Sequence, residues 1–279
     1  MPRNKVKVAK FSVSDTIESN LHNISVLCPF HDCLIWEGSH EDKKLQMLSL
    51  QDTPSLINEI TLAFYDCSIS SISGRETLYL SDHINKLIVS VSIDGTIKHL
   101  KDVYPLVPLC VHVTGNDEIV FGVVDQNSYE VDTRCIRLII KMTMDGDILH
   151  EYQFDDRIIR LFTIPIQCDV NPINDDILVV DSSGNSSGSV VCCTKDDHLR
   201  FRYTGNWNKT SGVFNPTDVI CTNEGLIFVC DINNSIHILD INGNLVKYIC
   251  TTDSNIYNPQ FKNICLYHCR YNLKFLNVF

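Results

Sequence analysis

Residues 214–249, FNPTDVICTNEGLIFVCDINNSIHILDINGNLVKYI, contain the pattern that decides the fold. Short runs rich in Val, Ile and Phe alternate with turns built from Asn, Asp and Gly, which is typical of β-strands joined by tight turns. The dipeptide Asn242-Gly243 favours a two-residue hairpin turn, because both central positions of that turn need positive φ angles. The stretch therefore predicts a four-stranded antiparallel meander whose strands are so apolar that neighbouring sheets must cover them.

The same pattern recurs along the chain, with an acidic residue closing the second strand of each copy. These residues follow one another at intervals of about 50 positions, a period typical of propeller blades; they are Glu37, Asp82, Asp125, Asp181 and Asp231. The predicted blades span about 22–60, 65–101, 106–154, 162–205 and 214–250, and a partial blade combines residues 6–17 with 257–279. We therefore expect one all-β domain over residues 1–279, a six-bladed type of β-propeller with an incomplete sixth blade of about three strands.

Composition and charge narrow the classes of function. The chain has 279 residues, of which 44% are hydrophobic and 20% charged, an ordinary globular balance. Its formal net charge of −11 disfavours attraction to nucleic acid or anionic lipid. The thirteen cysteines form an odd and irregularly spaced set, which predicts reduced thiols and a cytoplasmic protein. Every apolar run is shorter than a membrane span needs, so we expect no membrane partner.

The quoted stretch resembles an NHL repeat. It has a Phe-x-Pro entry at Phe214, a Val-x-Asp end to the second strand at Asp231, and an Asn shortly after it. The preceding LRFRYTG (199–205) resembles the outer strand of a blade in the NHL propellers of tripartite-motif proteins. The resemblance extends over about residues 10–260 and implies recruitment of protein ligands. The RING, B-box and coiled-coil parts of that family have no counterpart in this sequence, so ubiquitin transfer would be supplied elsewhere.

The expected binding residues lie in turns after the second strands and in one connection between blades. Exposed loop aromatics and polar turn residues on a propeller face make good anchors for a protein partner. The candidates are His83, Asn85, Asn127, Tyr129, Asn233, Asn234, Trp207 and Lys209. Trp207 could equally fold onto its own blade, since large aromatics usually bury most of their surface. Lys195, Arg200, Arg202 and Lys209 form a basic run that we interpret as solvated surface charge. Trp36 lies in an apolar run and is expected in the core.

Three motifs carry possible chemistry, and each has a structural interpretation that we prefer. The repeated aspartates could bind calcium in a channel, but one in every repeat favours a role in bonding turn N–H groups. GNSSG (184–188) matches a nucleophile motif around Ser186, yet a strand follows it in place of the required helix. Two Cys/His groups, Cys28/His31/Cys33 and Cys265/His268/Cys269, resemble half-sites for zinc but lack four convergent positions. We therefore predict no catalytic residue, metal or cofactor, which leaves enzymatic activity uncertain and disfavoured.

Three functional hypotheses follow from these observations. The leading one is a protein-interaction scaffold or substrate-recruitment propeller, resembling the C-terminal NHL domain of tripartite-motif ubiquitin ligases. The second is an RNA-binding NHL propeller, which the acidic net charge disfavours because phosphate contacts need clustered Lys and Arg. The third is a calcium-dependent hydrolase or lactonase-like propeller, which would need a coordinating set in the channel.

Overall fold

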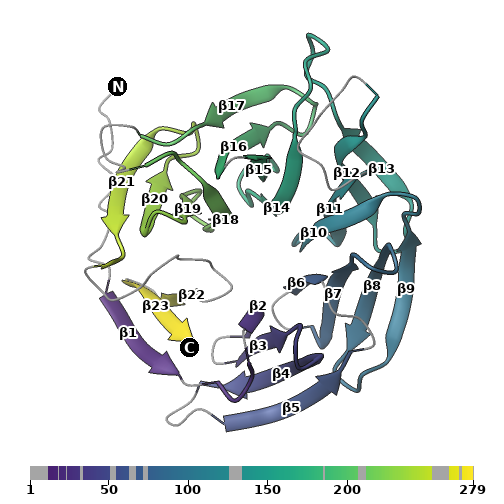
Figure 1. The fold of residues 1–279 in the computed structure, drawn as a ribbon, viewed down its shortest axis with the longest axis vertical. Coiled ribbons are helices and arrows are strands. Elements are labelled where there is room, and N and C mark those ends of the chain that lie inside the picture. The colour runs from purple at the N-terminus through teal and green to yellow at the C-terminus, as the bar shows by residue number, and fades with distance from the viewer. Residues whose placement is uncertain are drawn as a thin grey trace.

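The computed structural model of the protein describes residues 12–17, 19–22, 24–31, 34–50, 55–62, 67–71, 75–125, 134–184, 186–206, 212–252, 264–269 and 272–278. Its strands form five four-stranded sheets and one three-stranded sheet. Figure 1 shows these sheets arranged around a ring, and each four-stranded sheet has its first strand towards the centre and its last strand at the rim. Over these ranges, the chain contains no helix with the length and hydrophobicity that crossing a membrane requires.

The five four-stranded sheets are the blades, numbered here in chain order. Blade one contains β2 (Ile24–His31), β3 (Leu34–Ser39), β4 (Lys44–Ser49) and β5 (Ser55–Thr61). Blade two contains β6 (Cys67–Ser71), β7 (Thr77–Asp82), β8 (Leu87–Ser92) and β9 (Ile97–Asp102). Blade three contains β10 (Val107–Val113), β11 (Glu118–Val124), β12 (Arg137–Thr143) and β13 (Ile148–Tyr152). Blade four contains β14 (Ile164–Val170), β15 (Ile177–Gly184), β16 (Ser187–Cys193) and β17 (Leu199–Tyr203). Blade five contains β18 (Pro216–Cys221), β19 (Ile227–Asp231), β20 (Ser235–Leu239) and β21 (Leu245–Cys250).

The stretch that predicted the meander folds as one. Its four runs are β18 to β21, paired antiparallel in sequence order. Gly243 has a φ of 79° in the hairpin before β21, and its N–H donates to the carbonyl of Asp240 at 2.9 Å. A Cβ at Gly243 would lie 2.6 Å from the Phe201 ring of the preceding blade. The glycine is therefore required both by the turn and by the close approach of blade four.

The hydrophobic core is divided into layers between neighbouring blades. Successive strand residues point to opposite faces of a sheet, so Leu178 packs towards blade five while Val179 packs towards blade three. Trp36 is almost fully buried between blades one and two, as expected from its apolar run. A blade that lies between two other blades is thus covered on both faces, which explains why its strands contain so few polar residues.

The blade count corrects the prediction from the sequence. Five complete blades form the propeller, in place of the six-bladed type with an incomplete sixth blade. The closing strands pair with one another in a separate sheet and do not form a further four-stranded blade. The strand pairing that we expected between the chain ends is nevertheless present. β1 (Ser12–Ile17), β23 (Asn272–Val278) and β22 (Ile264–Cys269) form a separate three-stranded sheet in the order β1-β23-β22, which lies between β21 and β2 in Figure 1.

The directions of the strands in this closing sheet differ from those in a blade. β22 and β23 are antiparallel, whereas β1 pairs with β23 in parallel. In an antiparallel meander, the second and fourth strands point the same way and the third strand separates them. A fourth strand placed directly beside a second strand must therefore pair with it in parallel. The closing sheet has the strand directions of a blade that lacks its third strand.

Candidate functional site

The antiparallel order of the strands decides which connections share a face of the ring. Within each blade, the turn between the second and third strands lies at the same end as the connection to the next blade. The turn between the first and second strands lies at the opposite end, together with the hairpin between the third and fourth. The propeller seen face-on in Figure 1 therefore presents two faces built from different connections.

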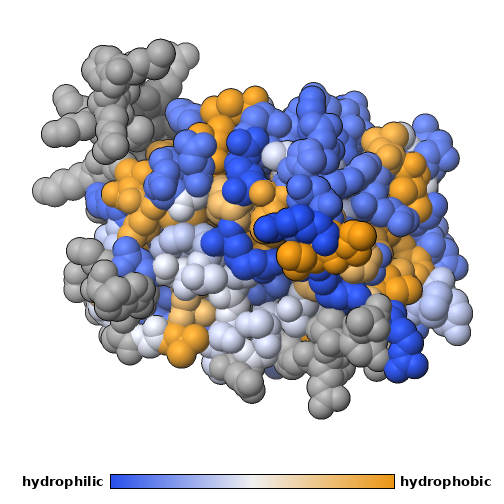
Figure 2. All heavy atoms as spheres, turned by 90° about the horizontal axis from the view of Figure 1, so that it is seen from above, coloured by the Kyte–Doolittle hydropathy of each residue, from blue (hydrophilic) through white to orange (hydrophobic). Residues whose placement is uncertain are grey.

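Exposed hydrophobic side chains gather on the first of these faces. Tyr104, Ile158 and Val213 lie in three connections between blades and are 74%, 81% and 66% exposed. Other exposed residues come from the same connections or from turns after second strands. The full set, which defines the apolar face, is Ile84, Tyr104, Ile136, Phe154, Ile158, Ile159, Val213 and Ile232. In the view from the rim, hydrophobic residues form several separate patches bordered by hydrophilic ones (Figure 2). The exposed hydrophobic residues of the apolar face come from separate turns and connections.

The opposite face is dominated by carboxylates and is called the acidic face. Its turns and hairpins contain Asp94, Asp117, Asp145, Asp147, Asp175, Asp196, Asp197, Glu224 and Asp240. Two of these groups, Asp94 and Asp240, accept hydrogen bonds from backbone N–H groups of their own hairpins. Asp94 accepts a hydrogen bond from the N–H of Thr96 at 2.9 Å, which lowers the pKa of Asp94. Within the described parts of these turns, Ile173 is the one exposed large hydrophobic residue. Asp94 and Asp240 therefore have a structural role in their exposed hairpins.

The repeated aspartates bond turn N–H groups, as the sequence predicted. Asp82 is almost completely buried and accepts hydrogen bonds from the N–H groups of Ile84 and Asn85, at 3.1 and 2.9 Å. Asp231 is completely buried and accepts from the N–H of Asn215, which belongs to the connection arriving from blade four. A carboxylate in this position joins the turn of its blade to the incoming chain. These buried caps hold the connections of the apolar face in place.

Asp181 shows the electrostatic consequence of burying such a cap. Its carboxylate accepts from the N–H groups of Thr163 and Ile164, at 2.6 and 2.9 Å, and lies 3.4 Å from Nη1 of Arg202. Burial nevertheless raises the pKa of Asp181 to about 6, because removal of the charge from water outweighs these favourable contacts. Arg202 also donates to the carbonyl of Leu161 at 2.6 Å. The same arginine therefore ties the outer strand of blade four to the connection before it.

Two other blades supply a cationic or ionisable partner for the repeated aspartate from the third strand. In blade three, the buried Arg137 lies with Nη1 2.7 Å from the carboxylate of Asp125. In blade five, Nε2 of His237 lies 3.6 Å from the carboxylate of Asp231. Such partners offset the cost of burying a carboxylate. In blades three, four and five, the repeated aspartate therefore has an arginine or histidine neighbour.

The surroundings of His237 superficially resemble a catalytic triad. Ser235 Oγ lies 3.2 Å from Nε2 of His237, and the hydroxyl of Tyr203 lies 2.7 Å from Nδ1. A working triad places the carboxylate and the nucleophile on opposite ring nitrogens, whereas Asp231 and Ser235 both face Nε2. His237 and Ser235 are also completely buried. This network therefore joins blades four and five and has no access for a substrate.

Two of the predicted contact residues support the turn of blade two. Nε2 of His83 lies 3.1 Å from the carbonyl oxygen of Leu109, on the inner strand of blade three. The amide of Asn85 donates to the carboxylate of Asp82 at 2.6 Å. These polar groups are engaged within the protein, so a contact with a partner would have to use their exposed edges. Their role in binding stays a prediction.

Blade five uses its two predicted residues in the same way. The amide of Asn233 donates to the carbonyl of Val213 at 2.7 Å and to the carboxylate of Asp231 at 2.8 Å. Asn234 has a φ of 59°, and its carbonyl accepts a hydrogen bond from the N–H of Thr251. Asn is one of the few residues that tolerates this left-handed conformation. Both residues lie on the apolar face and shape its turn, and their contact with a partner also stays a prediction.

The remaining predicted contact residues fall outside the described part of the chain. They are Asn127, Tyr129, Trp207 and Lys209.

The basic run that includes Lys209 also contains two arginines, Arg200 and Arg202, whose contacts the structure describes. Arg200 forms an ion pair with the buried Asp176, with Nη2 3.1 Å from Oδ1. Since Arg202 is similarly committed to Asp181, the two arginines stabilise blade four and do not form a free cationic patch.

A histidine–carboxylate pair on the inner strands was not anticipated from the sequence. Nδ1 of His112 lies 3.1 Å from Oδ1 of Asp169, and the other carboxylate oxygen accepts from the N–H of Cys221 at 2.6 Å. Blades three, four and five thus meet at Asp169, whose pKa is raised by burial. The His112 side chain is 25% exposed. The repeats did contain a signal for this pair, because His112 and Asp169 occupy equivalent positions. Each lies two residues before the first turn of its blade, which begins at Thr114 or Asn171.

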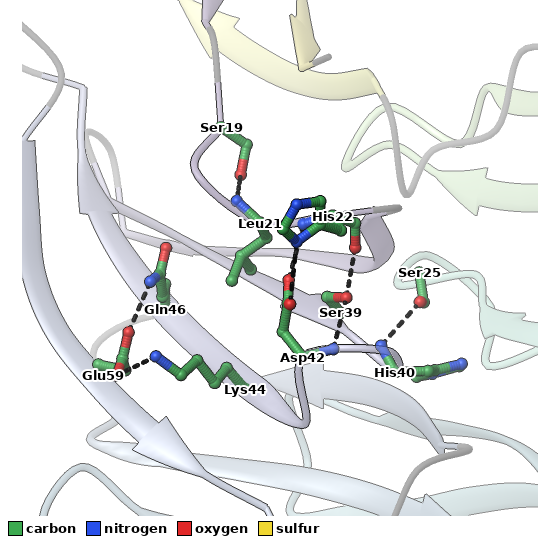
Figure 3. Close-up of polar contacts among 10 residues, drawn as sticks. All are labelled: Ser19, Leu21, His22, Ser25, Ser39, His40, Asp42, Lys44, Gln46 and Glu59. Carbon is green, nitrogen blue, oxygen red and sulfur yellow. Dashed lines mark hydrogen bonds and ion pairs between the residues drawn. The ribbon is translucent and has the colours of Figure 1, made fainter.

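Blade one has its own polar network, which holds the segment after β1 (Figure 3). The N–H of His22 donates to Asp42 at 2.7 Å, and the hydroxyl of Ser39 donates to the carbonyl of His22. Ser19 donates to the buried Glu37 at 2.7 Å. Burial raises the pKa of Glu37 although this hydrogen bond opposes the shift. The network attaches residues 19–22 to blade one and so fixes the point at which β1 leaves it.

The nucleophile-like motif around Ser186 and the two Cys/His groups are the remaining candidates for catalytic or metal chemistry. Ser186 has a φ of 57° in the hairpin between β15 and β16, so the strand-to-helix turn needed by a nucleophile motif is replaced by a strand-to-strand turn. Cys28 is buried, and its thiol lies 3.2 Å from the Ser71 hydroxyl of blade two. Within the residues described, no group of three or more His, Cys, Asp or Glu side chains could hold a metal ion. The other members of the two Cys/His groups lie outside the described side chains.

Comparison with known proteins establishes the architecture. No protein-family model matches the sequence, and no curated protein matches it. Among solved structures, a chain of a nidogen/laminin complex aligns with a TM-score of 0.57 and 15% identity, covering 91% of this chain and 84% of that one. A putative gluconolactonase aligns with a TM-score of 0.58 and 13% identity, covering 88% and 87%. A streptogramin B lyase aligns with a TM-score of 0.56 and 16% identity, covering 80% and 67%. At these identities the likeness concerns the fold, and the chain is an all-β propeller.

Proposed function

We propose that the protein is a binding module that docks a protein partner on its apolar face. The concentration of exposed hydrophobic side chains on that face carries the proposal. Hydrophobic patches rimmed by polar residues are typical of interaction sites. The finer hypothesis, a recruitment propeller of the tripartite-motif type, rests on the NHL-like pattern of residues 214–249.

Preorganisation of the connections supports this function. Tyr104 follows a turn in which its N–H donates to Asp102 at 2.8 Å, and Nζ of Lys86 lies 4.8 Å from the centre of its ring. Val213 is held through its carbonyl by the amide of Asn233. Side chains that are already ordered lose little conformational entropy on binding. Aromatic and aliphatic anchors on such a frame are suited to protein recognition.

Variants of the two faces test this proposal. Proteins captured by the wild type would be compared quantitatively with those captured by the apolar-face variants Tyr104→Ser and Val213→Ser. The acidic-face variant Ile173→Ser is the matched control, because it also removes an exposed hydrophobic side chain. We expect specific partners to be lost from the apolar-face variants and retained by the control. Equal capture by all variants would refute the assignment.

A lactonase-like hydrolase is the second candidate, favoured by the pair of His112 and Asp169 on the inner strands. Asp169 contacts Nδ1 and leaves Nε2 as the nitrogen that could accept a proton. Some propellers of similar fold are gluconolactonases by description. The test measures hydrolysis of gluconolactone with added calcium and with a chelator. Turnover that His112→Ala abolishes, and that the exposed-strand variant His99→Ala retains, would support the enzyme. Equal rates in all three proteins would dispose of it.

RNA binding is retained as a weaker alternative. The net charge of −11 opposes it, and Arg200 and Arg202 are paired with buried carboxylates. Nucleic-acid affinity from phosphate contacts falls steeply with salt. A titration with structured RNA at low ionic strength is therefore the most permissive test. Measurable binding that weakens with salt would revive this hypothesis.

The closing sheet is proposed to fill the gap between blade five and blade one. Its strand directions are those of a blade without a third strand, and β22 lies against β2, the inner strand of blade one. An open ring would expose the apolar sheet faces of blades one and five, and large exposed apolar patches favour aggregation. Removal of residues 1–17 should therefore promote self-association, measured by light scattering. A truncated protein that stays as monodisperse as the full chain would contradict this role.

A further inference from the structure

The strand β1 is attached to the propeller differently from the outer strand of a blade. Each outer strand follows its neighbour through a short connection, whereas β1 and its neighbour β23 lie at opposite ends of the chain. Their pairing is parallel and is interrupted by a bulge between Val13 and Asp15. Parallel pairs are slightly less stable per residue than antiparallel ones. Within the closing sheet, β1 is therefore an edge strand that no local connection ties to its neighbour (Figure 1).

The chain just after β1 is, by contrast, firmly fixed to blade one. The N–H of His22 donates to Asp42 at 2.7 Å (Figure 3). Ser19 donates to the buried Glu37 at 2.7 Å. A single residue joins the end of β1 to Ser19. β1 can therefore separate from β23 as one unit on a short hinge, while the segment behind it keeps its contacts with blade one.

Separation of β1 would leave the edge of β23 open. Such an edge presents unpaired N–H and C=O groups and accepts another strand. The β1 strand of a second copy fits this edge, because it repeats the register that runs from Ser12 opposite Lys274 to Ile17 opposite Val278. A short hinge favours exchange between copies over return to the same ring. Exchanged strands restore every pairing of the closed form, which makes such a dimer a low-cost assembly.

We infer that the protein forms a dimer in which two copies exchange β1, so that each β1 pairs with β23 of the other copy. The dimer goes beyond the proposed binding function and does not involve the apolar face. Each copy has a formal net charge of −11, so two copies repel each other. Salt screens that repulsion, and we therefore expect exchange to increase with ionic strength.

The experiment follows β1 from one copy to another. A benzophenone amino acid, which forms covalent links under light, replaces Ser12 in an unlabelled copy of the full chain. This copy is mixed at high concentration with an isotopically heavy copy that lacks the group, and the products are irradiated and analysed by mass spectrometry. A link from position 12 to the heavy β23 reports exchange, because position 12 lies opposite Lys274. We expect such links, and their yield should rise severalfold from low to high salt.

A change in hinge length tests the mechanism of exchange. A Gly-Ser-Gly-Ser insertion between Ile17 and Glu18 lets each strand return to its own ring, so links between copies should fall severalfold. The matched control carries the same insertion between Gly115 and Asn116, in an exposed turn where a Cβ on Gly115 would meet nothing within 4 Å. The control should leave the links between copies unchanged.

A second set of samples carries the benzophenone group at position 277 of β23, opposite Thr16, so that the result does not depend on one position. Links confined to single copies at every salt and protein concentration would overturn the inference. Links from position 12 to heavy segments other than β23 would reveal association through another surface and also overturn it. Links between copies that decrease with salt, or that the hinge insertion leaves unchanged, would contradict strand exchange as well.

Discussion

The two faces of the propeller solve the same local problem in different surroundings. In blade five, Asp231 and Asp240 each accept hydrogen bonds from backbone N–H groups of the following turn. Asp231 is completely buried beneath the apolar face and also bonds the N–H of Asn215 from the incoming connection. Asp240 is accessible to water on the acidic face and accepts hydrogen bonds from Asn242 and Asn244 of its own hairpin. The difference shows that burial, more than the kind of hydrogen bond, decides how firmly a connection is held.

This difference has a functional consequence. A connection fixed by a buried carboxylate can display an apolar side chain in one position, as Asp155 fixes the hairpin of residues 154–160 that displays Ile158. A turn closed by an exposed carboxylate remains hydrated and contributes negative charge. The acidic face therefore favours solubility, while the apolar face exposes hydrophobic side chains on fixed connections.

The largest expected effect is on stability, when each of the two turn-capping carboxylates of blade five is removed in turn. Asp231→Ala should lower the free energy of unfolding by about 3–5 kcal/mol, because buried donors lose their acceptor and His237 loses its carboxylate. Asp240→Ala should cost only about 1 kcal/mol, since water can replace the lost acceptor. Urea unfolding followed by circular dichroism measures both values. Similar losses in the two variants would break the contrast between the faces.

A smaller effect is expected from the pH dependence of Asp181. Its folded pKa of about 6 lies above the ordinary value of 3.8, so the folded protein binds this proton more tightly than the unfolded chain. Stability should therefore be highest below about pH 4 for this group and fall by up to about 3 kcal/mol as the pH rises through 6. Asp181→Asn should remove that loss, which unfolding curves between pH 4 and 7 would reveal.

Asp94 on the acidic face provides a control, because its pKa is shifted in the opposite direction to that of Asp181. Its folded pKa is lowered by the N–H of Thr96, so its contribution is present above the unfolded pKa and is lost as the pH falls. Asp94→Asn should remove a stabilisation at neutral pH rather than a penalty. A change of the same sign in both variants would show that the surroundings of the two carboxylates do not differ as described.

The smallest effect concerns the backbone at Ile158 in the hairpin of residues 154–160, where φ is 63°. Ile158→Gly should raise the free energy of unfolding by about 1 kcal/mol, because glycine adopts the left-handed conformation without the steric cost of a β-branched side chain. Ile173 on the acidic face does not have a positive φ, so Ile173→Gly should be neutral or slightly destabilising. Thermal unfolding of the two variants gives the comparison. A lower melting temperature for Ile158→Gly would contradict the strain.

The repeat pattern predicted much of the architecture from local chemistry. Apolar runs, Asn-Gly and Asp-Gly turns and the repeated aspartates located the strands, because each depends on residues close together in the chain. The role of Asp82 and Asp231 in bonding turn N–H groups was predicted for the same reason. The number of blades was not predicted correctly, since the number of sheets around a ring depends on how the two ends of the chain meet.

The candidate site was less accessible from the sequence. The turns after second strands were predicted to bind a partner. The structure places these turns on one face, where the polar groups of Asn85 and Asn233 are engaged in holding them. The exposed anchors Tyr104 and Ile158 were missed, because an apolar residue in a connection looks like a core residue until its burial is known. The pair of His112 and Asp169 was missed because it joins two strands that are distant in sequence.

The sequence by itself determined that the chain would form antiparallel four-stranded units with capped turns, since strand pattern, turn geometry and capping act over a few neighbouring residues. Only the tertiary structure decided which carboxylates are buried, which isoleucines are exposed, and that β1 joins β23 in parallel. These properties depend on contacts between segments far apart in the chain. Burial alters both the cost of a charge and the gain from an apolar side chain, so function on this propeller is set where blades meet and where their connections leave the core.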